Sequence, residues 1–184
     1  MREISEHILD ITQNSITADA SLVQILVNAD ADADEFEIIV EDNGRGMSEE
    51  FLQNVLSPFS TSRTTRKVGL GIPMFKETSR TCDGSFEIES KPGKGTKVIA
   101  RLKLSHIDRP PLGAFADTIY ILILSNQELN FYIEMKCDSE CSVFDTRKMR
   151  IVLGEVEFDN PDVSLWIRQS LEESERKVFG GKNI

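Results

Sequence analysis

The stretch from Asp42 to Met47 reads Asp-Asn-Gly-Arg-Gly-Met, a carboxylate followed by two glycines that are spaced by one residue. The Asp42 carboxylate can accept a hydrogen bond from an amine of a ligand. Gly44 and Gly46 carry no Cβ, so the backbone can take a positive φ and a ligand can approach closely. The pattern predicts a ligand-binding turn, and a tight turn with an incidental acid is the alternative.

A second group of polar residues recurs at steps of three and four near the N-terminus. They are His7, Asp10, Asn14 and Thr17. On a helix these positions share one stripe. The Asp10 carboxylate can orient or deprotonate a water, and the Asn14 amide oxygen can ligate a hard cation such as Mg²⁺. A solvated helix surface is the alternative, and we interpret His7 as a neighbour or a surface residue rather than a catalyst.

A basic, hydroxyl-rich segment extends from Ser57 to Val68 and carries Arg63, Arg66 and Lys67 within five residues. Cations clustered in an acidic chain suggest a lid that meets phosphate oxygens, and a surface loop with solvated charges is the alternative. The next residues, Gly69-Leu70-Gly71, are predicted to open a helix. Free backbone N–H groups at such a start suit an anion, although this short motif alone is weak evidence.

The elements that must position these residues follow from hydrophobic periodicity. Apolar residues at Ile4, Ile8 and Ile11 predict a first helix that ends near Ala18. The remaining expected elements are strands at 22–27 and 35–40 joined by an acidic turn, a helix at 48–56, and a hairpin of strands at 85–90 and 96–104 around Lys91–Gly95. The acidic turn is not a calcium loop, because Glu35 stands where that loop requires glycine.

Composition narrows the class of function. The formal net charge is 21 − 31 = −10, which argues against non-specific binding to nucleic acid or to an anionic membrane. The N-terminus enters an amphipathic pattern directly, so we expect no signal peptide, and the longest apolar run, Ile119–Leu124, is too short to span a bilayer. Three cysteines without a secretion signal indicate reduced thiols in a cytoplasm.

Taken together, the motifs between residues 4 and 104 resemble the GHKL family, which is named for gyrase B, a heat-shock chaperone, histidine kinases and MutL. The resemblance implies that Asn14 ligates Mg²⁺, that Asp42 accepts from the adenine amino group, and that Thr96 lies near the adenine. It also implies that the two glycine motifs form the nucleotide site. The cofactor-binding residues expected on this basis are Asp42, Gly44, Gly46, Met47, Arg63, Arg66, Lys67, Gly69, Leu70, Gly71 and Thr96.

The implied fold is α/β (α+β), a two-layer sandwich with a mixed sheet, helices on one face, and ATP between the helices and the lid. The implied function is a Mg²⁺-dependent ATPase or a protein kinase subunit that acts with a partner protein, with Asp10 as the catalytic residue. Family ATPases and serine kinases resemble one another in carrying glutamate there, so Asp10 keeps the carboxylate with a shorter reach. A nucleotide-gated binding protein with little turnover is therefore the alternative, and dimerisation stays open.

The rest of the chain suggests an extension. Pro110-Pro111 within 105–113 marks a linker, which divides an ATP-binding domain, 1–104, from an α+β module, 114–184. In the module we expect antiparallel strands at 118–124 and 130–136, a helix at 146–153, and a last helix from Asn160-Pro161 that buries Trp166. Cys137 and Cys141 are interpreted as core or turn thiols rather than metal ligands. Docking of a partner on this module is a hypothesis.

Overall fold

The computed structural model describes residues 2–56, 71–182 and 184 of the 184-residue chain. Along the described sequence, pairs of consecutive strands are separated by one or two helices. Their bounds are α1 Ile4–Thr17, β1 Leu22–Asp30, β2 Glu35–Asp42, α2 Glu49–Leu56, α3 Gly71–Thr81, β3 Ser85–Lys91, β4 Gly95–Lys103, α4 Phe115–Ser125, β5 Asn130–Cys137, β6 Glu140–Asp145, α5 Thr146–Leu153 and α6 Pro161–Phe179.

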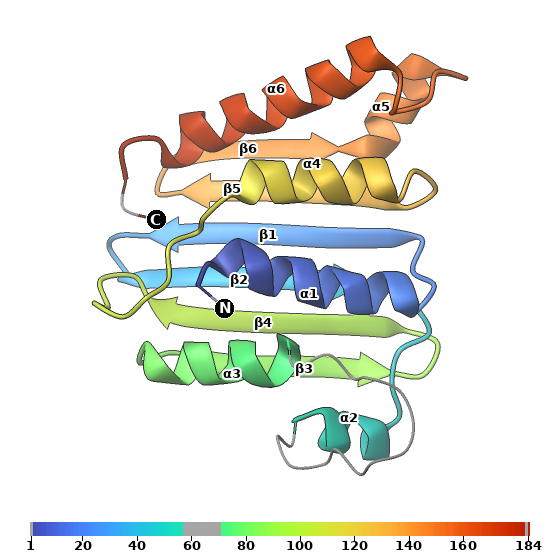
Figure 1. The fold of residues 1–184 in the computed structure, drawn as a ribbon. Helices are drawn as coiled ribbons and strands as arrows, with labels where there is room; N and C mark the ends of the chain where they lie inside the picture. Colours follow the sequence, from blue (N-terminus) through green and yellow to red (C-terminus); the bar gives the residue numbers. More distant parts are fainter. Residues whose placement is uncertain (1, 57–70, 183) are drawn as a thin grey trace.

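A six-stranded mixed sheet forms the frame of the molecule, with strand order β3-β4-β2-β1-β5-β6. β1 pairs antiparallel with β2 and parallel with β5, and the outer strands pair antiparallel with their neighbours. The helices α1, α3, α4 and α6 lie on the same face of this sheet (Figure 1). The structure therefore confirms the two-layer α/β sandwich that the sequence predicts.

Alternation along the strands separates the two faces of the sheet. In β2, Phe36, Ile38 and Val40 are buried beneath the helices, while the intervening Glu37 and Glu41 lie on the other face. That other face is supported by ion pairs between strands, since Arg101 approaches Glu37 to 2.8 Å. Such a face satisfies its charges with one another and with water, which explains why the strands read as alternating rather than continuously apolar.

Most elements predicted in the first 104 residues are confirmed. The acidic turn joins β1 to β2, the Lys91–Gly95 turn joins β3 to β4, and the N–H of Phe51 donates to the Ser48 Oγ at the start of α2. The second glycine motif is followed by a helix, because α3 begins at Gly71. Residues 57–70, which include the predicted lid and its three cations, lie outside the described residues.

The predicted strand at 118–124 is wrong, because these residues belong to helix α4. A short apolar run does not distinguish a buried helix from a buried strand. In the structure Phe115, Ile119 and Leu122 are buried at helical spacing, and α4 packs between α1 and α6. The antiparallel partner of β5 is instead β6, and its other neighbour is β1.

Trp166 is also placed differently from the prediction. Its side chain is 52% exposed, whereas Ile167 and Leu171 form the buried stripe of α6. The Trp166 ring lies beside the ring of Phe144, with centroids 6.3 Å apart, so it covers the edge of the core rather than entering it. The predicted helices at 146–153 and from Asn160-Pro161 are confirmed, and Asp145 and Asn160 cap them by accepting from backbone N–H groups at the helix starts.

The segment 105–113 packs along the body of the protein. Leu112 is 3% exposed, and the carbonyls of Pro111 and Leu112 accept from the N–H groups of Ile4 and Ser5. The N–H of Leu112 in turn donates to the carbonyl of Ile184. Because β5 also joins β1 in one sheet, the segments before and after this stretch share a core. The predicted division into 1–104, 105–113 and 114–184 stays a prediction about independent folding.

Within the described part of the chain, none of the helices combines the length and apolar character that crossing a membrane requires. Cys82 and Cys137 are buried free thiols, and Cys141 is an exposed one.

Candidate functional site

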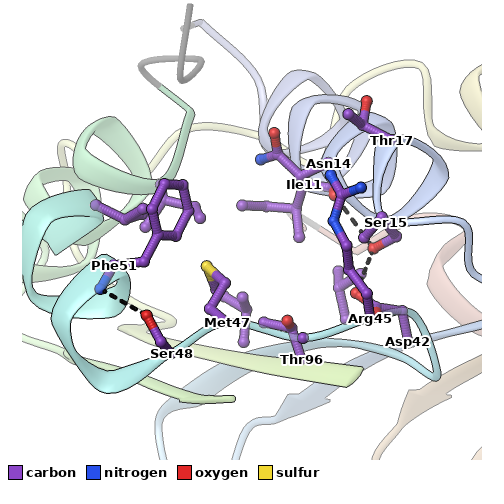
Figure 2. A pocket seen from close by; sticks show the side chains of 16 residues that line it. Ile11, Asn14, Ser15, Thr17, Asp42, Arg45, Met47, Ser48, Phe51 and Thr96 are labelled. Carbon is purple, nitrogen blue, oxygen red and sulfur yellow. Dashed lines mark hydrogen bonds between the residues drawn. The ribbon is translucent and has the colours of Figure 1, made fainter. Parts of the chain in front are cut away.

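A cavity of about 560 Å³ lies at the end of the sheet where β2 finishes and β4 begins, between α1 and α2 (Figure 2). Its walls are mainly apolar. These walls include Ile11, Val40, Met47, Val55, Ile72 and Val98. Five predicted site residues line it, namely Met47 of these walls together with Asn14, Asp42, Gly46 and Thr96. A concave apolar space with a few polar groups is the usual form of a small-molecule site.

Asp42 is a buried carboxylate at the floor of this cavity, with 8% of its surface exposed. One oxygen, Oδ1, accepts from the backbone N–H of Gly44 at 2.9 Å, and Oδ2 accepts from the Ser15 hydroxyl at 2.7 Å. A carboxylate has about four acceptor positions. Lone pairs therefore remain for a ligand amine, as the sequence predicts for this residue.

Ser15 was missed by sequence reasoning. It lies next to Asn14 on α1, is 1% exposed, and lines the cavity. Its contact with Asp42 joins residues 27 positions apart, so only the tertiary fold reveals it. The sequence feature that could have indicated Ser15 is its small hydroxyl side chain, next to Asn14 on a helix that was expected to contact a ligand.

Gly46 and its neighbours bring two backbone segments into contact at the cavity. Gly46 has φ of +65°, and a Cβ there would lie 2.0 Å from the carbonyl oxygen of Lys91 in the β3–β4 turn. A side chain at this position is thus excluded by both conformation and space. The N–H of the next residue, Met47, donates to the Ser90 Oγ at 2.8 Å. The first glycine motif therefore fastens β2 to the β3–β4 hairpin.

Arg45 is a second residue that the prediction omitted. It lines the cavity together with Thr17, and its guanidinium lies 3.6 Å from the exposed carboxylate of Asp19. Figure 2 shows its side chain extending past Asp42 toward the end of α1. Arg45 therefore contributes a cation at the cavity rim, on the side opposite Phe51 of α2.

Asp10 lies one helical turn from Asn14 and packs against the start of α3. A Cβ at Gly71 would lie 2.7 Å from the Asp10 Cβ and 2.9 Å from its Oδ2, so the α3 backbone meets this side chain directly. Burial, with a smaller contribution from Glu6, raises the pKa of the Asp10 carboxyl. Asp10 is not among the cavity-lining residues, whereas Asn14 is.

The oxygens of Asp10 and Asn14 are the hard donors that Mg²⁺ prefers. Within the described residues no cluster of three or more His, Cys, Asp or Glu side chains is arranged to hold a metal. A Mg²⁺ ion usually takes one or two protein ligands and completes its shell with water and phosphate. The donor set of this helix therefore suits a cation that arrives with an anionic ligand. Arg63, Arg66, Lys67, Gly69 and Leu70 lie outside the described residues.

His7 is fully buried, so of the two expected positions the surface one is wrong, and His7 is instead a buried neighbour of Asp10 on α1. Its ring stacks on Phe75 with centroids 4.5 Å apart, and its Nε2 lies 3.2 Å from the Thr78 Oγ1. Burial lowers the pKa of His7 from 6.5 to about 4. The neutral ring thus joins α1 to α3, one turn away from the contact between Asp10 and Gly71.

A protein-family model described as "Histidine kinase-, DNA gyrase B-, and HSP90-like ATPase" matches residues 2–106. Similar proteins include the sensor protein kinase FleS of Pseudomonas aeruginosa, 34% identical over 110 residues, which are 60% of this chain and 27% of that protein. Sporulation kinase D of Bacillus subtilis is 31% identical over 102 residues, 55% of this chain and 20% of that protein. The chain thus spans roughly a quarter or less of the length of these relatives.

Solved structures show the same fold. The MutL ATPase domain of Aquifex aeolicus, complexed with ADP, aligns with 99% of this chain and 70% of its own, with a TM-score of 0.50 and 14% identity. The N-terminal domain of a DNA repair protein aligns with 98% of this chain and 58% of its own, with a TM-score of 0.55 and 12% identity. The matched family model covers more than half of the sequence and contains every predicted site residue. The chain therefore belongs to the GHKL family of histidine kinase-, DNA gyrase B- and HSP90-like ATPases.

Proposed function

We propose that this protein binds ATP with Mg²⁺ in the cavity beneath α1 and transfers the terminal phosphoryl group to a hydroxyl, either that of water or that of a partner protein. The observation that carries the proposal is the placement of Asp42 and Thr96 at the floor of an apolar cavity that has Asn14 on its wall. This order of groups suits a flat base with an amine at one end and an anionic tail at the other.

The adenine is proposed to lie between the apolar residues of the cavity, with its amino group donating to Asp42. Asn14 would hold the Mg²⁺, which would supply positive charge against the phosphates. The N-terminus of α3, starting at Gly71, would direct free N–H groups toward the phosphates. Asp42 and Asn14 line this cavity, as does Ile72, the residue of α3 that follows Gly71.

Asp10 is proposed to accept the proton of the attacking hydroxyl. A carboxylate whose pKa is raised by burial is a better base near neutral pH than an exposed one. Attack by a hydroxyl gains from such a base, because the oxygen loses its proton during transfer. This reasoning favours water or a Ser/Thr hydroxyl of a partner over an imidazole, which attacks through an existing lone pair.

The competing function is a nucleotide-gated binding protein with little or no turnover. The observation in its favour is that Asp10 stands behind Gly71 and outside the cavity lining. Aspartate also reaches one methylene less far than glutamate. In this alternative, ATP would change the surface offered to a partner without being consumed.

One experiment separates the two functions. Titration calorimetry with ATP and Mg²⁺ measures binding, and phosphate release measures turnover, for the unmodified protein, Asp10→Asn and Asp10→Glu. We expect Asp10→Asn to keep ATP affinity within a few-fold and to lose turnover by about 100-fold or more, the usual effect of removing a general base. Asp10→Glu retains the base and should stay active.

Equal phosphate release by the unmodified protein and Asp10→Asn would contradict the assigned role of Asp10. ATP binding with no release above background in any of the three proteins would exclude water as the acceptor, which is also the result that the gated binding protein predicts. Failure of the unmodified protein to bind ATP would overturn the proposal as a whole.

A further inference from the structure

Ser90, Thr96 and Asp42 form a polar row across three neighbouring strands. Asp42 of β2 pairs directly with Thr96 of β4, and Thr96 pairs directly with Ser90 of β3. All three side chains lie on the helix-covered side of the sheet. Side chains at directly paired positions are close enough to interact. Asp42 and Thr96 line the cavity, whereas Ser90 stands behind them and does not.

The hydroxyl of Ser90 uses its whole hydrogen-bonding capacity within the protein. The Ser90 oxygen accepts from the Met47 N–H at 2.8 Å, and the Ser90 O–H donates to the Gly95 carbonyl at 2.9 Å. The Thr96 Oγ1 lies 2.9 Å from the same oxygen. A hydroxyl has one proton and two acceptor positions. Both remaining contacts are made at once only when Ser90 donates its single proton to the Gly95 carbonyl and accepts from Thr96, so we assign Thr96 as the donor.

The proton of Thr96 is therefore directed away from the cavity, and only its lone pairs face a ligand. Ser15 behaves alike, because its proton goes to the Asp42 Oδ2 at 2.7 Å rather than to the Ile11 carbonyl at 3.3 Å. The floor of the cavity thus presents acceptors from Asp42, Thr96 and Ser15. Other lining donors, Asn14, Thr17, Arg45 and Ser48, belong to α1 or the rim and not to this row.

We infer that Ser90 is a specificity-determining positioning residue, which makes the site select a 6-amino purine over a 6-oxo purine by fixing the direction of the Thr96 proton. The inference rests on the proposed function, because it assumes that a purine nucleotide occupies this cavity. An exocyclic amine brings donors to the acceptor floor. A 6-oxo purine brings only the single proton of N1 and sets the lone pairs of its carbonyl against the remaining acceptors, and buried acceptors without donors are costly.

The test compares the dissociation constants of ATP and ITP, which differ only at position 6 and the adjacent ring nitrogen, by calorimetry in the presence of Mg²⁺. The unmodified protein should prefer ATP by at least about 100-fold, as expected for a site whose polar groups would otherwise be left unpaired. In Ser90→Ala the Thr96 hydroxyl is free to rotate and donate to the carbonyl of ITP. The preference for ATP should then narrow by about tenfold, the effect of one hydrogen bond.

Ser90→Thr is the matched control, because it keeps the hydroxyl, and it should preserve the preference for ATP. Thr96→Val is the second variant, which removes the directed hydroxyl without disturbing the Met47 contact and should also narrow the preference. If Ser90 acts through Thr96, adding Ser90→Ala to Thr96→Val should change the ratio no further. Thermal unfolding of each variant identifies any that do not fold, and if Ser90→Ala is among them, Thr96→Val still tests whether the Thr96 hydroxyl sets the ratio, on which the inference depends.

The inference would be overturned if Ser90→Ala changed the dissociation constants of ATP and ITP by the same factor, or if Thr96→Val left their ratio unchanged. Either result would leave the proposed ATP binding intact. An unmodified protein that binds neither nucleotide would overturn the proposed function together with this inference. A ratio of dissociation constants that narrows in Ser90→Ala and stays unchanged in Ser90→Thr would support both the proposed function and this inference.

Discussion

At the scale of single residues, Asp42 illustrates what a motif predicts and what it leaves out. The acid at a strand end followed by two glycines predicts an acceptor for a ligand amine. The structure adds its two donors, the Gly44 N–H and the Ser15 hydroxyl, and the cross-strand Thr96. These contacts fix the orientation of the carboxylate before a ligand arrives. Base recognition in this site is therefore expected to depend on a small preorganised network rather than on one side chain.

Asp42→Asn is expected to weaken ATP and adenosine by about 10- to 100-fold, since the amide nitrogen must face either the ligand amine or one of the two protein donors. Inorganic triphosphate, which has no base, should bind as it does to the unmodified protein. Calorimetric titrations with the three ligands check this. The matched control is Asp19→Asn, which neutralises an exposed acid near the rim. Equal losses for inorganic triphosphate and ATP would show that Asp42 does not read the base.

At the scale of elements, the packing of α1 on α3 sets the distance between Asp10 and the start of α3. Periodicity identifies both helices, but it does not say which faces meet. The structure shows that His7 stacks on Phe75, while Asp10 meets Gly71 one turn further along. Helix α4 shows this limit of periodicity more strongly. Its short apolar run is also compatible with a strand, and only its packing between α1 and α6 distinguishes the two. Whether this segment forms a helix or a strand therefore depends on the elements packed against it.

The buried His7 makes this helix pair sensitive to acid. Its pKa is about 4 in the folded protein and 6.5 when the ring is in water. Between these two pH values the ring is protonated in the unfolded chain and neutral in the folded chain. Stability contributed by the neutral ring is therefore lost as the pH falls from 6.5 toward 4. His7→Phe keeps an aromatic ring against Phe75 and removes the titration. When the pH is lowered from 7 to 4.5, the free energy of unfolding should fall by about 2 kcal/mol less in His7→Phe than in the unmodified protein.

Urea unfolding at the two pH values measures this difference. His106→Phe is the control, because it removes the other histidine of the chain from a partly exposed loop. If unmodified protein and His7→Phe lose the same free energy of unfolding on acidification, His7 does not control the acid sensitivity of the helix pair.

At the scale of the whole molecule, residues 114–184 complete the sheet that carries the cavity. β5 pairs with β1 over its whole length, and buried side chains from both halves form a single core. The residues that the first half would lose as neighbours include Ile119, Leu122, Phe131, Ile133 and Met135. The N-terminus, the 105–113 segment and the C-terminal residue are also tied together by backbone hydrogen bonds. The second half therefore acts as a structural part of the fold, whatever else it binds.

A chain that ends at Gly113 is expected to lose cooperative unfolding. Burial of each large apolar side chain contributes about 1.5 to 3 kcal/mol, so loss of five such contacts approaches the 5 to 15 kcal/mol stability of a typical domain. Circular dichroism during urea unfolding checks this, with the full-length protein as reference. A truncated chain that unfolds in one sharp transition and still binds ATP would instead support the predicted division at residues 105–113.

The sequence by itself carried the resemblance that implied the family and the two-layer sandwich. It also predicted the order of most elements, because glycine, acid and apolar spacing are local properties of the chain. It identified Asp42, Asn14 and Thr96 as residues of one site, and these line one cavity. Only the tertiary structure decided that α4 is a helix, that β5 joins β1, that His7 is buried, and that Ser15 and Ser90 contact Asp42 and Thr96. Those features depend on contacts between segments far apart along the chain, and a hydrogen bond across 27 residues leaves no periodic trace in either segment.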